Sequence, residues 1–254
     1  MPSKYILTPY FLDEPLAGLA ELERPGWALN TPALSGATQM ERLGVIHGEL
    51  AGHVEEVIRQ GSRPVSIAGD CCAALGVYAG LHRSGIDPQL IWFDAHGDFN
   101  TWETSPSGFL GGMPLAILAG LGEQTILEVL EIDPLPQEQI ILTDARDLDP
   151  GERELVESSL LTHLQDPRAL LSQTLHDRPL WVHFDTDVVD PAYVPAQNYT
   201  APGGLSPDEL GRVFQHLADT GRITAVSLSS WAPDLPGAEV SRDASLALLE
   251  ILSG

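Results

Sequence analysis

Short apolar runs bounded by turn residues recur along the chain, and each is four or five residues long. Their apolar residues are continuous rather than alternating with polar ones, which is typical of strands that are covered on both faces of a parallel sheet. The predicted strands are Lys4–Thr8, Pro64–Ile67, Leu90–Phe93, Gln139–Thr143, Leu180–Phe184 and Thr224–Leu228.

The segments between these runs show the spacing of amphipathic helices, with apolar residues three or four positions apart. Ser206 followed by Pro207 is a typical helix start, because serine accepts a hydrogen bond from the first turn and proline is tolerated there. The predicted helices are Thr38–Arg59, 72–83, Met113–Gly120, Pro150–Ser158, Asp166–Leu175, Pro207–Thr220 and Arg242–Leu252.

Alternation of strand and helix predicts an α/β fold with a parallel sheet. No internal repeat, low-complexity tract or linker divides the chain, so we expect residues 1–254 to form a single domain. Binding sites in such sheets form outside the carboxyl ends of the strands. Candidate chemistry is therefore sought where each predicted strand ends.

Charge and composition exclude several classes of protein. Thirteen Lys and Arg residues against 36 Asp and Glu residues give a net charge of −23, which disfavours binding to nucleic acids and to anionic membranes. The sequence has no apolar segment of the ~18 residues that a membrane span requires, and no signal peptide pattern. We therefore expect a cytoplasmic protein. Cys71 and Cys72 are adjacent, which disfavours a disulfide and fits a reducing compartment.

Acidic residues gather directly after two of the predicted strands. Asp94, His96 and Asp98 follow one strand, and Asp185 and Asp187 follow another. In an extended segment, alternate residues share one face, so these side chains would point together. Four carboxylates buried without partners would be costly, and the chain has a single lysine and no arginine beside them. A divalent cation is the simplest counter-charge, and oxygen ligands with one imidazole favour Mn²⁺ among the transition metals.

At these residues the sequence resembles the arginase, agmatinase and formimidoylglutamase family of ureohydrolases. The resemblance runs from about residue 40 to the C-terminus and rests on several spaced motifs. These are Ala68-Gly69-Asp70-Cys71-Cys72, Asp94-Ala95-His96-Gly97-Asp98, Ser107–Pro114, Arg146–Glu152, Asp185-Thr186-Asp187-Val188-Val189-Asp190-Pro191 and Gly203-Gly204-Leu205.

The resemblance implies a three-layer α-β-α fold with a mostly parallel sheet of about eight strands. It also implies two Mn²⁺ ions bridged by a hydroxide, which attacks the amidino carbon of a guanidino substrate. By position, Asp94 and Asp185 would bridge both metals. His96 and Asp187 would complete the ligands of the second metal, and Asp98 would bind the first. Asp98 and Asp185 are accordingly the expected catalytic residues.

The family pattern also implies residues that recognise an α-amino acid. Asn100, Ser105 and Ser107 stand where arginases bind the substrate carboxylate, and Asp149 and Glu152 where they bind the amino group. The alternative is structural: the serines would be ordinary loop polar residues, and Asp149 to Glu152 would form a helix cap. Retention of so much of this set favours an α-amino acid substrate.

Three positions depart from the family pattern. Cys71 replaces a metal-binding histidine, so it is either a buried small residue or a thiolate ligand, and a thiolate favours Zn²⁺ or Fe²⁺ over Mn²⁺. Gly111 replaces a histidine that shuttles protons, and Ser230 replaces a glutamate that holds the guanidinium. Nω-Hydroxyarginine hydrolases of the family share the cysteine and glycine, and their less basic substrate needs both missing groups less.

The sequence leaves three hypotheses for the function. The first is a metal-dependent amidinohydrolase of arginine or a modified arginine, with one or two ions. The second is a binding or scaffold protein that kept the fold and lost catalysis and part of its metal site. The third is hydrolysis of formimino or amide substrates, with Trp102 and Phe109 shaping an apolar pocket. Family members are often trimers or hexamers, so a homo-oligomer is expected.

Overall fold

Eight parallel strands form the central sheet of this chain. The structure is a computed structural model that describes residues 1–254. In spatial order the strands are β4-β1-β5-β10-β9-β6-β7-β8, and every neighbouring pair is parallel. Their bounds are β1 Ser3–Thr8, β4 Ala28–Leu29, β5 Arg63–Ala68, β6 Gln89–His96, β7 Ile140–Asp147, β8 Thr162–Leu164, β9 Leu180–Asp185 and β10 Ile223–Ser229.

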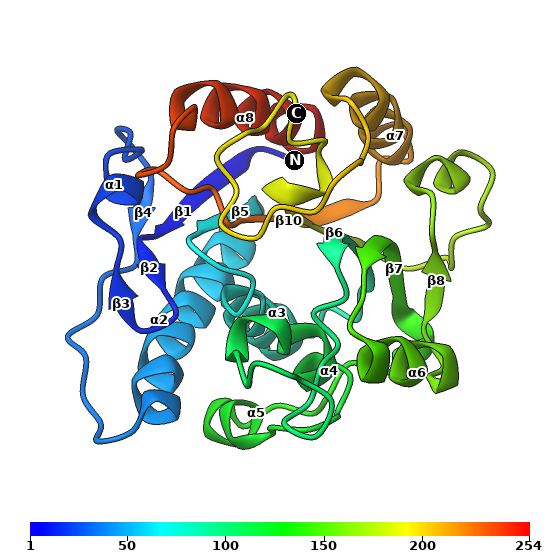
Figure 1. The fold of residues 1–254 in the computed structure, drawn as a ribbon. Coiled ribbons are helices and arrows are strands. Elements are labelled where there is room, and N and C mark those ends of the chain that lie inside the picture. The colour runs from blue at the N-terminus through cyan, green and yellow to red at the C-terminus, as the bar shows by residue number, and fades with distance from the viewer.

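Helices cover both faces of this sheet, which gives three layers (Figure 1). The longer helices are α2 Gln39–Arg59, α3 Ala73–Arg83, α6 Pro150–Ser158, α7 Pro207–Asp219 and α8 Ala238–Ser253. Helices α2 and α3 lie on one face, and α7 and α8 on the other. The remaining elements are short: β2 Tyr10–Phe11, β3 Glu14–Pro15, α1 Ala17–Ala20, α4 Pro114–Leu118, α5 Thr125–Leu130, η1 Leu110–Gly112, η2 Gln137–Gln139, η3 Pro167–Leu171 and η4 Thr186–Val188.

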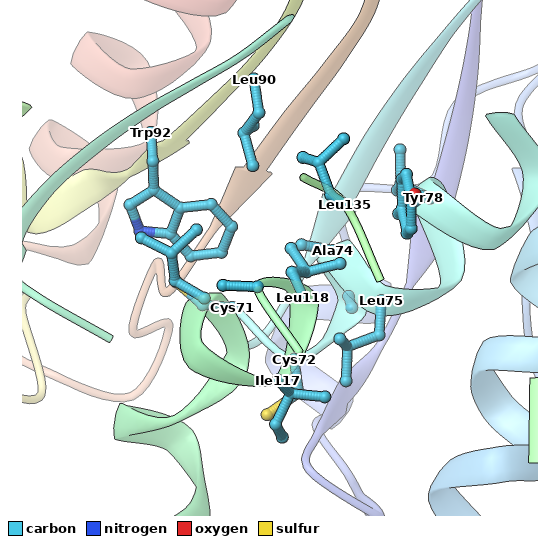
Figure 2. Close-up of a cluster of buried hydrophobic side chains, with 14 of the residues drawn as sticks. Cys71, Cys72, Ala74, Leu75, Tyr78, Leu90, Trp92, Ile117, Leu118 and Leu135 are labelled. Atoms are coloured by element: carbon cyan, nitrogen blue, oxygen red, sulfur yellow. The ribbon is translucent and has the colours of Figure 1, made fainter. Parts of the chain in front are cut away.

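Two hydrophobic clusters fill the space between these layers. The larger contains Leu90, Trp92 and Trp181 of the sheet together with apolar residues of α2 and α3, and Figure 2 shows part of it. The smaller packs Phe93 and Phe184 of the sheet against Phe214 of α7. Each central strand therefore points apolar side chains into the core on both of its faces. This explains why its apolar residues are continuous in the sequence.

The predicted fold class and all six predicted strands are confirmed. Helix α7 also begins as expected, with the Ser206 hydroxyl accepting a hydrogen bond from the backbone N–H of Glu209 at 3.3 Å. The prediction of a helix over Asp166–Leu175 is wrong. Only the turn Pro167–Leu171 is helical, as a 3₁₀ helix, because Pro167 and Leu170 are its only buried residues and residues 171–174 are exposed or half-buried. No helix is long and apolar enough to cross a membrane.

Helix α2 carries a buried histidine that makes stability depend on pH. His47 is 2% exposed and both ring nitrogens lack a hydrogen-bond partner. Burial lowers its pKa from 6.5 to about 4, so the folded state keeps the ring neutral where the unfolded chain is already protonated. Stability should therefore fall as the pH drops from 6.5 towards 4, by about 1.4 kcal/mol per pH unit for this group.

This acid sensitivity is tested with His47→Leu, which replaces the ring by an apolar side chain in the same helix. Urea unfolding between pH 7.5 and 4.5 should show a shallower loss of stability in the variant than in the parent protein. His53→Leu, at a partly exposed position of the same helix, is the matched control and should leave the slope unchanged. Equal slopes for His47→Leu and the parent protein would contradict the assignment.

Candidate metal centre and substrate pocket

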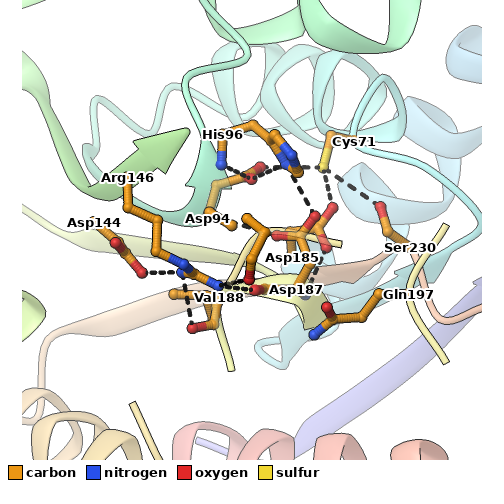
Figure 3. Close-up of polar contacts among 12 residues, drawn as sticks. Cys71, Asp94, His96, Asp144, Arg146, Asp185, Asp187, Val188, Gln197 and Ser230 are labelled. Atoms are coloured by element: carbon orange, nitrogen blue, oxygen red, sulfur yellow. Dashed lines mark hydrogen bonds and ion pairs between the residues drawn. The ribbon is translucent and has the colours of Figure 1, made fainter. Parts of the chain in front are cut away.

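The acidic residues predicted at the strand ends meet at one point in the structure. Strands β6 and β9 are neighbours in the sheet, so the residues at their carboxyl ends come together. Metal-ligating atoms of Cys71, Asp94 and Asp185 lie within 4.8 Å of one another, and those of Asp94, His96 and Asp187 do the same. Asp94 belongs to both groups, and Figure 3 shows them side by side.

Local hydrogen bonds orient the two central carboxylates. One oxygen of Asp94 accepts the backbone N–H of His96 at 2.8 Å, and one oxygen of Asp185 accepts that of Asp187 at 2.9 Å. The other oxygen of each carboxylate faces the sulfur of Cys71, at 3.8 Å from Asp94 and 3.1 Å from Asp185. The two-residue spacing of the motifs therefore fixes one oxygen of each carboxylate and turns the other towards Cys71, where Asp94 Oδ2 also accepts the indole N–H of Trp92 at 3.3 Å.

His96 closes the second group of candidate ligands. Its Nδ1 lies 3.0 Å from Asp187 Oδ2 and 3.5 Å from Asp94 Oδ1. The other oxygen of Asp187 accepts the backbone N–H of Ala95 at 3.1 Å. This group therefore presents two carboxylates and one imidazole, a donor set that suits Mn²⁺.

Asp98 reaches the same cavity by a route that the sequence argument missed. Strand β6 ends at His96, and Asp98 has a left-handed φ of 49°, so the expectation of an extended segment is wrong here. Asp98 is 5% exposed, and its Oδ2 is buried without a hydrogen-bond partner. A buried carboxylate oxygen without a partner is costly, and a cation beside it would remove that cost.

Burial also changes how these carboxyl groups hold protons. It raises the pKa of Asp185 to about 8 and that of Asp187 to about 6, with a further contribution from the neighbouring carboxylates. Burial and the charges of Asp94 and Asp185 raise the pKa of Asp98 well above its usual range. No lysine or arginine side chain contacts the side chains of these residues. The cluster thus requires either protons or a metal cation, and its donor set fits the cation.

Arg146 supports this centre from outside the ligand set. Its guanidinium pairs with the carboxylate of Asp144 and donates to the backbone carbonyls of Asp187 at 2.8 Å and Val188 at 3.3 Å (Figure 3). It also donates to the carbonyl of Ala201 at 3.1 Å. These hydrogen bonds join the end of β7 to η4, which carries Asp187. In the sequence Arg146 was visible only as part of a family motif.

A cavity of about 500 Å³ opens above the carboxylates, and all the predicted site residues line it. Asn100 donates to Asp149 at 3.1 Å inside the cavity, while Ser105 and Ser107 lie at its rim. Several other lining residues could not be predicted from the sequence because no motif marks them. The predicted lining residues are Cys71, Asp94, His96, Asp98, Asn100, Ser105, Ser107, Asp149, Glu152, Asp185 and Asp187, and those missed include Phe11, Gln197, Asn198 and Tyr199.

The structural alternatives for some of these residues also have support. Ser105 and Ser107 accept hydrogen bonds from the backbone N–H groups of Gly108 and Phe109, as loop serines do. Glu152 accepts from the backbone N–H of Phe99 at 2.9 Å and that of Asp149 at 3.2 Å. Burial raises the pKa of Glu152 to about 7. These residues therefore shape the pocket wall, whether or not they also touch a substrate.

Comparison with known proteins matches this geometry to one family. The sequence profile of the arginase family matches residues 30–252. The arginase of Bacillus subtilis strain 168 is 30% identical over 218 residues, which cover 81% of this chain and 74% of that protein. The chain belongs to the arginase family. The predicted family is thereby confirmed.

One further relative and a solved structure show how far the similarity extends. An N(omega)-hydroxy-L-arginine amidinohydrolase of Streptomyces lavendulae is 34% identical over 165 residues, covering 64% of this chain and 58% of that protein. A crystal structure of Bacillus subtilis arginase superposes with a TM-score of 0.85 at 25% identity, covering 100% of this chain and 99% of that one. The predicted three-layer fold is thus that of arginase-family structures.

The departures from the arginase-family pattern all face the cavity. Cys71 and Ser230 lie 3.8 Å apart between sulfur and hydroxyl oxygen. At Gly111, an added Cβ would lie 2.3 Å from Cε1 of the Phe109 ring, so this ring occupies the space that a side chain at position 111 would need. Phe109 also stacks near Phe11 and Tyr199. Trp102 is 43% exposed and does not line the cavity, so the expectation that it shapes the pocket is wrong.

Proposed function

We propose that this chain is a metal-dependent amidinohydrolase that cleaves a C–N bond of an arginine-like amino acid, with Nω-hydroxyarginine as the preferred substrate. One observation carries the proposal: the candidate metal ligands and the candidate amino-acid ligands all line a single cavity. Membership of the arginase family supports the reaction class. A divalent metal bound there would lower the pKa of a water molecule and polarise the substrate.

The protein would contribute the positions of the reacting groups. Asp94, His96 and Asp187 would hold one ion, for which Mn²⁺ is the proposed metal, and Cys71 and Asp185 would complete a second position with Asp94. Asp98, with its unpartnered oxygen, would be a further ligand. Asn100 and Asp149, which are hydrogen-bonded to each other, would bind the charged groups on the substrate α-carbon.

The pocket chemistry favours the hydroxylated substrate over arginine. Neither Gly111 nor Ser230 supplies the acid or the anion that an unmodified guanidinium would use. A hydroxylated guanidine is less basic and carries less positive charge at neutral pH, so it depends less on the anion that Ser230 does not supply. The Streptomyces lavendulae relative, named for this substrate, is consistent with that preference.

The proposal is tested by assaying purified, metal-loaded protein with arginine, Nω-hydroxyarginine, agmatine and guanidinobutyrate. Release of hydroxyurea from hydroxyarginine, faster than urea from arginine, is the expected result. No release from any of the four substrates would overturn the proposal. The binding or scaffold alternative, which the comparisons do not favour, predicts fewer than one bound metal per chain under the same conditions. A homo-oligomer and a cytoplasmic location remain predictions.

A further inference from the structure

A row of polar side chains crosses the otherwise apolar layer between the sheet and α3, and it ends at the sulfur of Cys71. Ser227 and Ser229 point from β10, and His183 points from β9, where its register partner is Ser227. Trp181, two residues before His183, is at the far end of the row. All four residues are at most 4% exposed. A row so deeply buried needs internal partners for every polar atom.

Hydrogen-bond chemistry gives this row a direction. The indole N–H of Trp181 can only donate, and it donates to the Ser227 hydroxyl oxygen at 2.9 Å. The only acceptor within reach of the Ser227 hydroxyl hydrogen is Nδ1 of His183, also at 2.9 Å. Nδ1 is therefore the acceptor, and the proton of the neutral ring sits on Nε2.

The hydrogen bonds continue from His183 to the sulfur of Cys71. Nε2 of His183 lies 3.5 Å from the Ser229 hydroxyl oxygen, and that oxygen lies 2.9 Å from Sγ of Cys71. Because the Ser229 oxygen accepts from His183, its own hydrogen points to the sulfur. The His183 ring is fixed in this orientation by stacking on Trp92, with ring centroids 3.7 Å apart.

The sulfur thus has a hydroxyl donor on one side and two carboxylates on the other. Asp94 and Asp185 face it at 3.8 and 3.1 Å, and the unpartnered oxygen of the buried Asp98 lines the same cavity. A sulfur that already accepts a hydrogen bond from Ser229 can direct its other lone pairs towards a cation held by these carboxylates. Partners of this kind fix the orientation of a ligand and tune the metal.

We propose that Ser229, oriented by His183 and Ser227, positions the sulfur of Cys71 as a ligand of the Cys71–Asp94–Asp185 metal position. Sulfur ligation directs this position towards a thiophilic divalent cation such as Zn²⁺ or Co²⁺ and away from Mn²⁺. His183 and Ser229 are thus positioning residues that act through Cys71. The inference rests on the metal site of the proposed function, but it does not depend on which substrate is cleaved.

The test is titration of the metal-free protein with Co²⁺, followed by the sulfur-to-cobalt charge-transfer absorption. Ser229→Ala removes the hydroxyl donor. His183→Phe keeps a ring to stack on Trp92 but removes the N–H that orients Ser229. Each variant should bind Co²⁺ about 10–100-fold more weakly and shift the absorption band. Cys71→Ser should abolish the band.

The matched control is Ser66→Ala on β5. Ser66 pairs with Ser227 in the sheet, is 1% exposed, and its hydroxyl has no hydrogen-bond partner, so its removal should leave affinity and band unchanged. Thermal unfolding of each metal-free variant separates lost positioning from lost structure. The inference would be overturned if the parent protein lacked the band. It would also be overturned if Ser229→Ala and His183→Phe kept the affinity and the band of the parent protein. Because no readout involves turnover, the inference can stand even if the proposed reaction fails.

Discussion

Replacement of Asp185 by asparagine is expected to lower turnover by at least ~10²–10³-fold, the size of effect seen when one preorganised electrostatic group is removed from an active site. The side chain keeps its shape, and the amide oxygen can still accept the backbone N–H of Asp187. What is lost is the negative charge beside Cys71 and Asp94. Urea or hydroxyurea release and elemental analysis of bound metal measure the effect.

The same variant should behave differently without metal. Asp185 is 4% exposed, and burial raises its pKa to about 8, so the carboxyl group destabilises the metal-free fold whenever it is ionised. The metal-free Asp185→Asn variant should therefore unfold at a temperature equal to or above that of the metal-free parent. Asp177→Asn, at a fully exposed side chain, is the control and should change neither property. If Asp185→Asn turned over substrate as fast as the parent protein, Asp185 would not belong to the proposed site.

A histidine at position 111 should destabilise the protein unless Phe109 is also replaced by a smaller residue. In Gly111→His alone, the new Cβ would lie 2.3 Å from the Phe109 ring, and the ring would have to leave its place near Phe11 and Tyr199. Overpacking of this kind costs about 1–3 kcal/mol, which lowers the unfolding temperature by several degrees in a chain of this size. Thermal unfolding measures this loss.

The double variant Phe109→Ala/Gly111→His should relieve that overpacking and gain activity on arginine. It combines an imidazole acid with the space that the acid needs, so arginine turnover should rise by about tenfold or more over the parent, since general acids contribute ~10²–10⁴-fold. Phe109→Ala alone and Phe109→Ala/Gly111→Ala supply the space without the acid and should show no such gain. Equal arginine turnover in all three variants would show that the missing acid does not limit activity on arginine.

Much of the fold was predictable because local signals agreed with one another. Continuous apolar runs marked the six inner strands, and Ser206-Pro207 marked the start of α7. The edge strands β4 and β8 are two and three residues long, too short for any periodicity to detect. The segment after Asp166 had a helical pattern, but only Pro167 and Leu170 of its helical turn are buried and residues 171–174 are exposed or half-buried, so little burial supports a longer helix.

The candidate site was predictable as a set of residues but not as a geometry. The acidic motifs and the family position of Cys71 identified every candidate ligand, and the adjacency of β6 and β9 brings the acidic ones together. Three features depended on tertiary structure alone: the left-handed backbone of Asp98, the Phe109 ring over Gly111, and the polar row ending at Cys71. His183 and Ser229 lie in apolar strand sequences, where nothing local indicates that they contact each other.

The sharing of Asp94 between both ligand groups has a consequence for how the centre fills. A carboxylate that already neutralises one dication has less negative charge to offer another nearby, and two dications repel each other. The two occupancies are therefore thermodynamically linked, and filling should be stepwise, with the later ion bound more weakly. At low metal supply most molecules would hold a single ion. The difference between the two ligand sets, one with a sulfur and the other with an imidazole, then decides which element binds first.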